Sequence, residues 1–496
     1  MKTSLLAKNT VSSLVFQITT LICGFILPRL ILSKFGSEVN GLVNSITQFL
    51  GIISFLEMGV GAVVQSSLYK PLATKDDEWI SKIVASAEKF FRRLAYILLA
   101  YISFLVLFYP YFSNQNFGWV YTGGLIVAMS ISSFAQYYFG VVDRLLLSAD
   151  QRGYVQYNAQ TITLIINTAA CAVLIWMDQS IHMVKLTTSL IYLARPVALR
   201  MYVSRHYSIN RRIRYTGEPI RQKWNGVAQH VAAVVLSSSA SVILTIFSTL
   251  SNVSVYSVYN LVIHGVKQLF LSMTNGIHAL IGELWAKQKM EELRKLFDMT
   301  EWVIHTGTVF VFGCTGTLIL PFVQVYTDGI SDAQYIQPLF AVLYTIAHAG
   351  HCLRLPYNIM ILAAGHYKQT QSNYIIAAVL NIGISIVFVK VFGIIGVALG
   401  AMVALFYQTI WMAWYNSKNL VVRPMSCFWK QFVVDAVTVI LGVFLTRGLH
   451  MGAISYLSWL VMAIKAAAVW LAAICFVNII FYRNRMKLVI QKLMKK

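Results

Sequence analysis

The chain has 496 residues, of which 58% are apolar and 12% are charged, and its mean hydropathy is +0.66. Soluble proteins carry about 25% charged residues, so this composition excludes a soluble globular protein and indicates an integral membrane protein. A formal net charge of +22 would favour nucleic-acid binding in a soluble chain. In a membrane protein, basic connections instead fix the orientation and contact anionic lipid headgroups.

Long apolar runs recur along the whole chain, and each can cross a hydrocarbon core of about 30 Å as a helix. The first run is expected to be a retained span, because MKTSLLAKNT has no small-residue cleavage site behind a short apolar region. We predict fourteen spans, at residues 11–32, 42–69, 94–110, 119–141, 154–177, 181–203, 227–250, 261–284, 302–326, 339–364, 374–392, 397–415, 431–449 and 457–482.

The basic residues are divided unequally between the two sides of these spans. The connections on one side hold about 30 of the 40 Lys and Arg residues, and the positive-inside rule assigns that side to the cytoplasm. The opposite connections hold only Lys34, Lys390 and Arg447. Because an even number of spans places both termini on one face, both termini are predicted to be cytoplasmic. The outer connections are too short for an external catalytic domain.

The longer inner connections mix charged and apolar residues at helical spacing, which predicts amphipathic helices along the headgroups. These segments are residues 70–93, 204–226 and 285–302, together with the C-terminal tail.

A weak internal repeat relates the two halves of the chain. Residues 149–152 align with residues 365–368, and the second predicted span resembles the eighth. Six spans per unit is an even number, so the two units would be related by an axis along the membrane normal. We predict an all-α polytopic protein with an N-terminal six-helix bundle at 1–204, a basic connection at 205–226, a C-terminal six-helix bundle at 227–415, two additional helices at 416–482 and a basic tail at 483–496.

Seven cations lie inside apolar spans, where a charge at the helix centre costs about 2.5–3.5 kcal/mol. Glu57 is the one clear mid-span carboxylate, so acids cannot compensate most of these cations. A positive interior calls for an anion, and phosphate suits both Arg and Lys. Arg29, Lys185 and Arg200 lie near span ends, where long side chains can reach the headgroups. The four deeper cations are Arg195, Lys267, Arg354 and Lys465.

Prolines lie beside three of these cations. Pro28 precedes Arg29, Pro196 follows Arg195, and Pro356 comes two residues after Arg354. Proline frees a backbone carbonyl at membrane depth, which is tolerated against protein or a wet cavity, although a simple helix kink is an open alternative.

The sequence predicts no metal site and no cofactor. His348 and His351 are three residues apart, but no carboxylate lies near them in the sequence to complete a metal site. The six cysteines include no CxxC pair, and no GxxxxGK[ST] motif is present. Energy from ATP would therefore require another chain.

Six segments carry a family resemblance that runs almost from end to end. They are PRLILSKFGSEVNGLVNSI at 28–46, EMGVGAVVQSSLYKPLATKD at 57–76, AQYYFGVVDRLLLSADQ at 135–151, RQKWNGVAQH at 221–230, VSVYSVYN at 253–260 and AAGHYKQTQSNY at 363–374. With these segments the chain resembles the polysaccharide repeat-unit (Wzx-type) flippases of the multidrug/oligosaccharidyl-lipid/polysaccharide exporter superfamily.

This resemblance implies a MATE-like fold with a V-shaped cavity between two bundles. It also implies alternating access that moves an undecaprenyl-diphosphate-linked oligosaccharide from the inner to the outer leaflet of a bacterial cytoplasmic membrane, for capsule, exopolysaccharide or wall-polymer export. Polysaccharide polymerases and glycosyltransferases are the implied partners. The diphosphate-binding role carries over to Arg29, Lys267 and Arg354, and the depth of Arg195 and Lys465 makes them further candidates.

Two departures from similar proteins affect the predicted ion coupling. Acidic residues often stand in the stretch that here contains Ala240 and Ser241, and another stands where this chain has His348. Glu57 is then the best remaining acid for coupling to H⁺ or Na⁺. The alternatives are a multidrug or cation antiporter of the same fold, which would need cavity acids, and a membrane-embedded polymerase, which would need a large outer loop.

Overall fold

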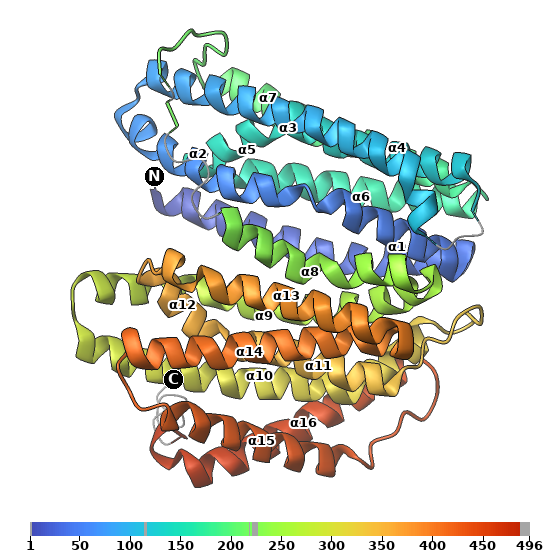
Figure 1. The fold of residues 1–496 in the computed structure, drawn as a ribbon, viewed down its shortest axis with the longest axis vertical. Helices are drawn as coiled ribbons and strands as arrows, with labels where there is room; N and C mark the ends of the chain where they lie inside the picture. Colours follow the sequence, from blue (N-terminus) through green and yellow to red (C-terminus); the bar gives the residue numbers. More distant parts are fainter. Residues whose placement is uncertain (1, 114–116, 218, 221–226, 487–496) are drawn as a thin grey trace. The chain divides into compact units, whose positions relative to one another are not determined.

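The computed structural model describes residues 2–113, 117–217, 219–220 and 227–486. Within these ranges the chain is helical apart from its connections, and no β-strand is present. The chain divides into two compact units, Met1–Ser254 and Val255–Lys496, which are coloured from blue to green and from green to red in Figure 1. The sequence-based division assigns residues 227–254 to the second bundle, and that division stays a prediction.

Unit 1 is built on α1, which packs along α6, while α7 packs on both α6 and α4 (Figure 1). Gly36 breaks α1 with a φ of +80°, a conformation that glycine adopts without a steric cost. The elements of unit 1 are α1 (Lys2–Gly51), α2 (Ser54–Thr74), α3 (Asp77–Phe112), α4 (Trp119–Ala135), the π-helix η1 (Gln136–Gly140), α5 (Val141–Ala149), α6 (Gly153–Trp176), α7 (Ile181–His206) and α8 (Val227–Phe247).

Unit 2 centres on α14, which packs against α13 and α11, and α10 packs against α11. Its helices are α9 (Leu250–Ala286), which begins at the end of unit 1, α10 (Met290–Tyr326), α11 (Pro338–Leu353), α12 (Leu355–Ala363), α13 (Tyr367–Phe392), α14 (Ile394–Asn419), α15 (Ser426–Thr446) and α16 (Tyr456–Phe481).

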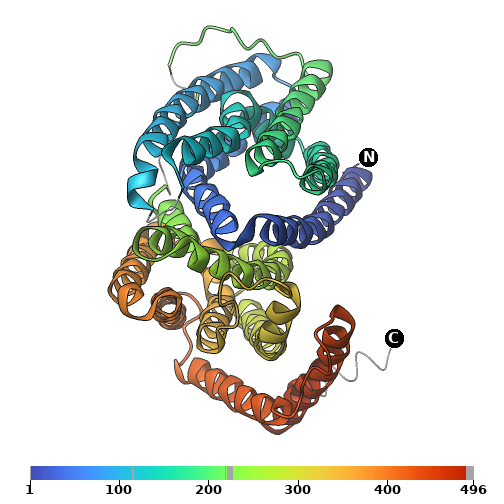
Figure 2. The ribbon, with the colours of Figure 1, turned by 90° about the vertical axis from the view of Figure 1, so that its right-hand side faces the viewer.

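The last two helices pack on each other and on α10, and Figure 2 shows them in red as a pair. Trp470 of α16 is 1% exposed and lies against glycines of both neighbouring helices. A Cβ atom at Gly313 of α10 would stand 2.5 Å from the Trp470 ring, and one at Gly442 of α15 would stand 2.3 Å from it. The absence of side chains at these two positions therefore lets the indole enter the α10–α15–α16 contact.

Nine helices within the described ranges are long and apolar enough to cross a membrane. The predicted all-α polytopic fold is confirmed, but several predicted spans differ in detail. The second span, 42–69, is interrupted at 52–53, where α1 ends and α2 begins. The tenth span, 339–364, is interrupted at Arg354, because Pro356 cannot continue the hydrogen bonding of α11.

The predicted amphipathic helices are only partly present. Residues 77–93 are helical, but they form the first part of a continuous α3 that Asp76 caps by accepting a hydrogen bond from the Trp79 amide at 2.9 Å. Residues 290–301 likewise begin a continuous α10. The predicted helix is wrong for 207–217, which is irregular. The rest of that connection at 221–226, and the end of the basic tail at 487–496, lie outside the described residues.

Candidate functional site

Unit 1 contains a cavity of about 400 Å³ between its helices. One wall is the interruption between α1 and α2, and another is the π-helix η1 with the end of α4. Short π-helical segments are rare in proteins, and those that do occur are often found at functional sites. The third wall is α7, which contributes two of the cations found inside the apolar sequence. The lining residues are Thr47, Leu50, Gly51, Ser54, Met129, Ser132, Ser133, Gln136, Tyr137, Lys185, Thr188, Ser189, Tyr192 and Arg195.

Arg195 is held in this cavity by neutral groups. Its Nε donates a hydrogen bond to Thr163 Oγ1 at 2.7 Å, and its guanidinium carbon lies 3.6 Å from the centroid of the Tyr192 ring. The Tyr192 hydroxyl in turn accepts a hydrogen bond from Asn167 Nδ2 at 3.3 Å. Among the described residues, no carboxylate forms an ion pair with Arg195. These contacts orient the guanidinium and leave its charge uncompensated.

Lys185 adds a second cation to the same cavity. It lies ten residues before Arg195 on α7, roughly 15 Å along the helix axis at 1.5 Å per residue. No carboxylate of the described residues forms an ion pair with it, and the lining side chains other than Lys185 and Arg195 are neutral. We call this space the Lys185–Arg195 cavity. Its charge is positive, and its serine, threonine and glutamine side chains supply further hydrogen-bonding groups.

Unit 2 brings a second set of cations together around Arg354, at the junction between α11 and α12. Arg354 is 7% exposed. Its Nη1 donates to Gln408 Oε1, and its Nη2 lies 3.3 Å from His351 Nδ1. Arg354 Nε and Gln408 Nε2 are buried and have no hydrogen-bond partner among the described residues. The guanidinium therefore retains an unused donor in the interior of unit 2.

Lys267 of α9 lies within electrostatic range of Arg354 and of both histidines of α11. We call Lys267, His348, His351 and Arg354 the unit 2 cation cluster. No ion pair joins any of its members to a carboxylate within the part of the chain that the structure describes. Sequence reasoning missed Gln408, although a lone amide within the apolar stretch of α14 is a usable signal for a buried polar contact.

The other predicted site residues lie elsewhere. Glu57 forms an ion pair with Arg144 of α5, a residue that the sequence analysis had assigned to an inner connection. Arg29 is half-buried in α1 and is not part of the cavity lining. Lys465 is exposed on α16, which packs on α10 and α15. The structure thus brings Lys185 together with Arg195, and Lys267 with Arg354.

Buried carboxylates missed by the sequence reasoning lie in α3 and α10. Glu88 is 5% exposed and accepts hydrogen bonds from Arg200, at 2.7 Å, and from Arg211. Asp143 of α5, fully buried, also contacts both arginines, at 3.4 and 2.5 Å. These acids therefore neutralise Arg200, which the sequence analysis had counted among the buried cations.

The corresponding acid of unit 2 is Glu301, which is 4% exposed. It accepts hydrogen bonds from Arg423 and from the Tyr357 hydroxyl. Burial lowers the pKa of Arg423, but the hydrogen bond and the charge of Glu301 outweigh burial, so the pKa is raised above its ordinary value. Beside this pair, His305 Nδ1 lies 2.6 Å from Asp435 Oδ2. The acids of unit 2 thus have partners apart from the cation cluster.

No protein-family model and no curated protein matches the sequence, whereas solved structures match its fold. The inward-facing conformation of a multidrug resistance MATE family transporter of the MOP superfamily matches with a TM-score of 0.61 and 16% identity, covering 81% of this chain and 95% of that chain. The outward-facing conformation of such a transporter matches with a TM-score of 0.57 and 13% identity, covering 84% of this chain and 95% of that chain. A Vibrio cholerae MATE transporter in the bent form matches with a TM-score of 0.53 and 11% identity, covering 85% of this chain and 98% of that chain. The chain has the MATE fold.

Proposed function

We propose that this protein is a transporter that moves a lipid-linked, diphosphate-bearing oligosaccharide from the inner to the outer leaflet of a bacterial cytoplasmic membrane. One observation carries the proposal. The Lys185–Arg195 cavity and the unit 2 cation cluster each contain one lysine and one arginine, and no described carboxylate forms an ion pair with these side chains. Such sites attract an anion.

The energetic argument favours a mobile anion over a structural role for these cations. A charge at the centre of a membrane span costs about 2.5–3.5 kcal/mol, and a purely structural protein would place acids beside the cations. This chain does so for Arg200, Arg211 and Arg423. The lysines and arginines of the two sites have no carboxylate partner among the described residues, and a diphosphate would supply the missing charge during each transport cycle.

Arg195 and Arg354 are each suited to a phosphate group, because guanidinium groups donate two parallel hydrogen bonds to phosphate oxygens. Lys185 and Lys267 add compact charges. The half-buried Arg29 stays a proposed diphosphate ligand. We leave Lys465 outside the proposed site, because its side chain is exposed on a helix whose neighbours are α10 and α15. Sugars would contact the hydroxyl and amide groups of the cavity, while the prenyl chain stays in lipid.

Alternating access is the proposed mechanism, since the fold is shared with transporters solved in inward-facing and outward-facing conformations. H⁺ or Na⁺ is the proposed coupling ion. Glu57 stays the proposed coupling acid, and this role requires its pair with Arg144 to open during the cycle. Glycosyltransferases that build the repeat unit and a polymerase that consumes it are the proposed partners.

A multidrug antiporter is the second candidate, because the solved structures of this fold are described as multidrug resistance transporters. Cationic drugs would require acids in the binding space, whereas both sites described above are positive. The two candidates therefore predict opposite responses to neutralisation of the cations.

The test is a pair of double variants in cells that assemble the lipid-linked repeat unit. Lys267→Gln with Arg354→Gln should block export and leave repeat units on the inner leaflet, while the protein still reaches the membrane. Lys267→Arg with Arg354→Lys keeps both charges and should retain part of the export. Lys465→Gln is the control for loss of one mid-span charge. Full export by the glutamine double variant refutes the proposal, and protein-dependent efflux of a cationic dye that survives in that variant supports the antiporter.

A further inference from the structure

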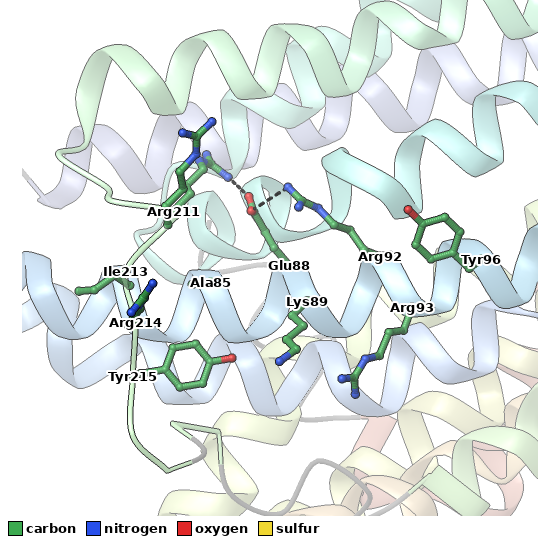
Figure 3. A pocket seen from close by; sticks show the side chains of 11 residues that line it. Ala85, Glu88, Lys89, Arg92, Arg93, Tyr96, Arg211, Ile213, Arg214 and Tyr215 are labelled. Carbon is green, nitrogen blue, oxygen red and sulfur yellow. Dashed lines mark hydrogen bonds and ion pairs between the residues drawn. The ribbon is translucent and has the colours of Figure 1, made fainter.

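Unit 1 has a second positive site, separate from the Lys185–Arg195 cavity. It is a pocket of about 670 Å³ between α3 and the irregular connection that follows α7. We call it the basic pocket, and Figure 3 shows its side chains. Its lining consists of Ala85, Glu88, Lys89, Arg92, Arg93, Tyr96, Arg211, Arg212, Ile213, Arg214 and Tyr215.

Helix α3 forms one wall because its lining residues recur at intervals of three and four. Such residues lie on one face of a helix, and that face carries Lys89, Arg92 and Arg93. The connection at 211–215 forms the other wall and supplies three more arginines. Six cations therefore surround one carboxylate, that of Glu88.

Glu88 does not neutralise this excess of positive charge, because its carboxylate is already bound to arginines and holds the connection against α3. It accepts hydrogen bonds from Arg211 and, at 3.4 Å, from Arg92 (Figure 3). Arg211 is also bound to Asp143 at 2.5 Å. No carboxylate of the described residues forms an ion pair with the four remaining cations of the pocket. These four are Lys89, Arg93, Arg212 and Arg214.

A comparison with unit 2 shows that a connection can be held to a long helix without these four cations. Glu301 and Arg423 form the same kind of pair between α10 and the connection after α14. Counting from the two glutamates, Lys89, Arg92 and Arg93 correspond to Trp302, His305 and Thr306.

That face of α10 is covered by the two C-terminal helices. Trp302 Nε1 donates to Asn478 Oδ1 at 2.7 Å, and His305 contacts Asp435. At the corresponding positions of α3, unit 1 has exposed cations, whereas unit 2 has side chains that contact α15 and α16.

We propose that the basic pocket binds a phosphate-bearing anion, either the headgroup of an anionic lipid or a soluble phosphate compound. Arginine forks match phosphate oxygens, and clusters of basic residues on the cytoplasmic side of a membrane protein attract anionic headgroups. The exposed aromatic ring of Tyr96 lies one turn beyond the cations on α3, where an acyl chain would follow. This favours the lipid. The proposal is independent of the transported substrate.

The test uses the full-length purified protein in detergent and a variant that keeps the anchor. Lys89→Gln, Arg93→Gln, Arg212→Gln and Arg214→Gln together remove the four unpaired cations and leave Glu88, Arg92 and Arg211 unchanged. The matched control removes four exposed cations of the predicted inner connections that do not line the pocket, and consists of Lys70→Gln, Lys75→Gln, Arg205→Gln and Lys368→Gln.

Two probes separate the possible sources of the anion. Retention of phosphatidylglycerol, measured by native mass spectrometry, tests the lipid, and calorimetric titration with inorganic pyrophosphate tests the soluble compound. We expect phosphatidylglycerol to bind the pocket variant at least about tenfold more weakly than the wild type, since each basic side chain near an anionic surface contributes several-fold, and the control to change little.

Tight pyrophosphate binding that the pocket variant alone loses would assign the site to a soluble phosphate compound. Equal binding of both probes by the pocket variant and the control would overturn the proposal. If the quadruple pocket variant does not reach the membrane, the double variant Arg93→Gln with Arg214→Gln is measured in the same way. Its control is the double variant Lys70→Gln with Arg205→Gln.

Discussion

Arg423 Nη1 donates a hydrogen bond to Glu301 Oε2 at 2.7 Å, and this pair repeats in unit 2 the pairing of Arg211 with Glu88 in unit 1. In both units, an arginine from the connection that follows α7 or α14 reaches a glutamate of a long helix, α3 or α10. Each arginine also contacts an aspartate, Asp298 in unit 2 and Asp143 in unit 1. The pairing fixes an irregular segment to the N-terminal part of each helix.

Replacement of Arg423 by Gln should lower the melting temperature of the protein strongly. Glu301 would remain buried without its cation, and removal of one partner from a buried pair costs about 3–5 kcal/mol. Arg423→Gln with Glu301→Gln should be less destabilised than the sum of the single variants, because the second change removes the stranded charge. Melting temperatures of the four proteins in detergent check this, and additive effects would contradict the pairing.

Glu57→Gln should likewise destabilise the protein by leaving Arg144 without its acid. The expected loss is on the order of 3 kcal/mol, as for other partly buried pairs. The double variant Glu57→Gln with Arg144→Gln should recover part of this stability. Thermal unfolding measures the recovery, and gradient-driven transport by the double variant separates a structural role from ion coupling. Transport at the wild-type rate would exclude Glu57 as the coupling acid.

Gly313→Ala should loosen the packing of the two C-terminal helices on α10. The added methyl group would stand 2.5 Å from the Trp470 ring, and overpacking of this kind costs about 1–3 kcal/mol. Gly383→Ala is the matched control, because nothing lies within 4 Å of its added Cβ. The control should be neutral or slightly stabilising, since alanine favours a helix by roughly 1 kcal/mol over glycine. Equal melting temperatures for the two variants would refute the assigned role of Gly313.

Arg195→Gln should reduce transport far more than Thr163→Val. The first change removes one of the two basic side chains of the cavity, whereas the second removes one neutral hydrogen bond, worth about 0.5–1.5 kcal/mol. Arg195→Lys keeps the charge but loses the planar guanidinium. Its transport rate should lie between those of the other two variants. Initial transport rates at saturating and limiting substrate distinguish weaker binding from slower turnover. An Arg195→Gln variant as active as Thr163→Val would contradict a role in binding an anion.

Apolar runs were sufficient to predict the all-α polytopic class, because hydrophobicity over about 20 residues is a local property. The MATE-like fold was predicted from the resemblance of six segments to a known family. Cations within the predicted spans, such as Lys185 and Arg195, were also visible as isolated charges in apolar sequence. Their partners were not predictable. Arg144 lies 87 positions from Glu57 and Gln408 lies 54 positions from Arg354, and neither separation has a periodicity that marks contact.

The sequence by itself determined that this chain crosses a membrane repeatedly, which side is predicted to face the cytoplasm, and that its predicted spans hold more cations than acids. Tertiary structure alone decided which cations are neutralised. Arg200 meets Glu88 and Asp143, whereas Lys185 and Arg195 share a cavity with neutral side chains. The reason is physical: the cost of a buried charge depends on the groups within a few ångströms, and helix packing sets those groups.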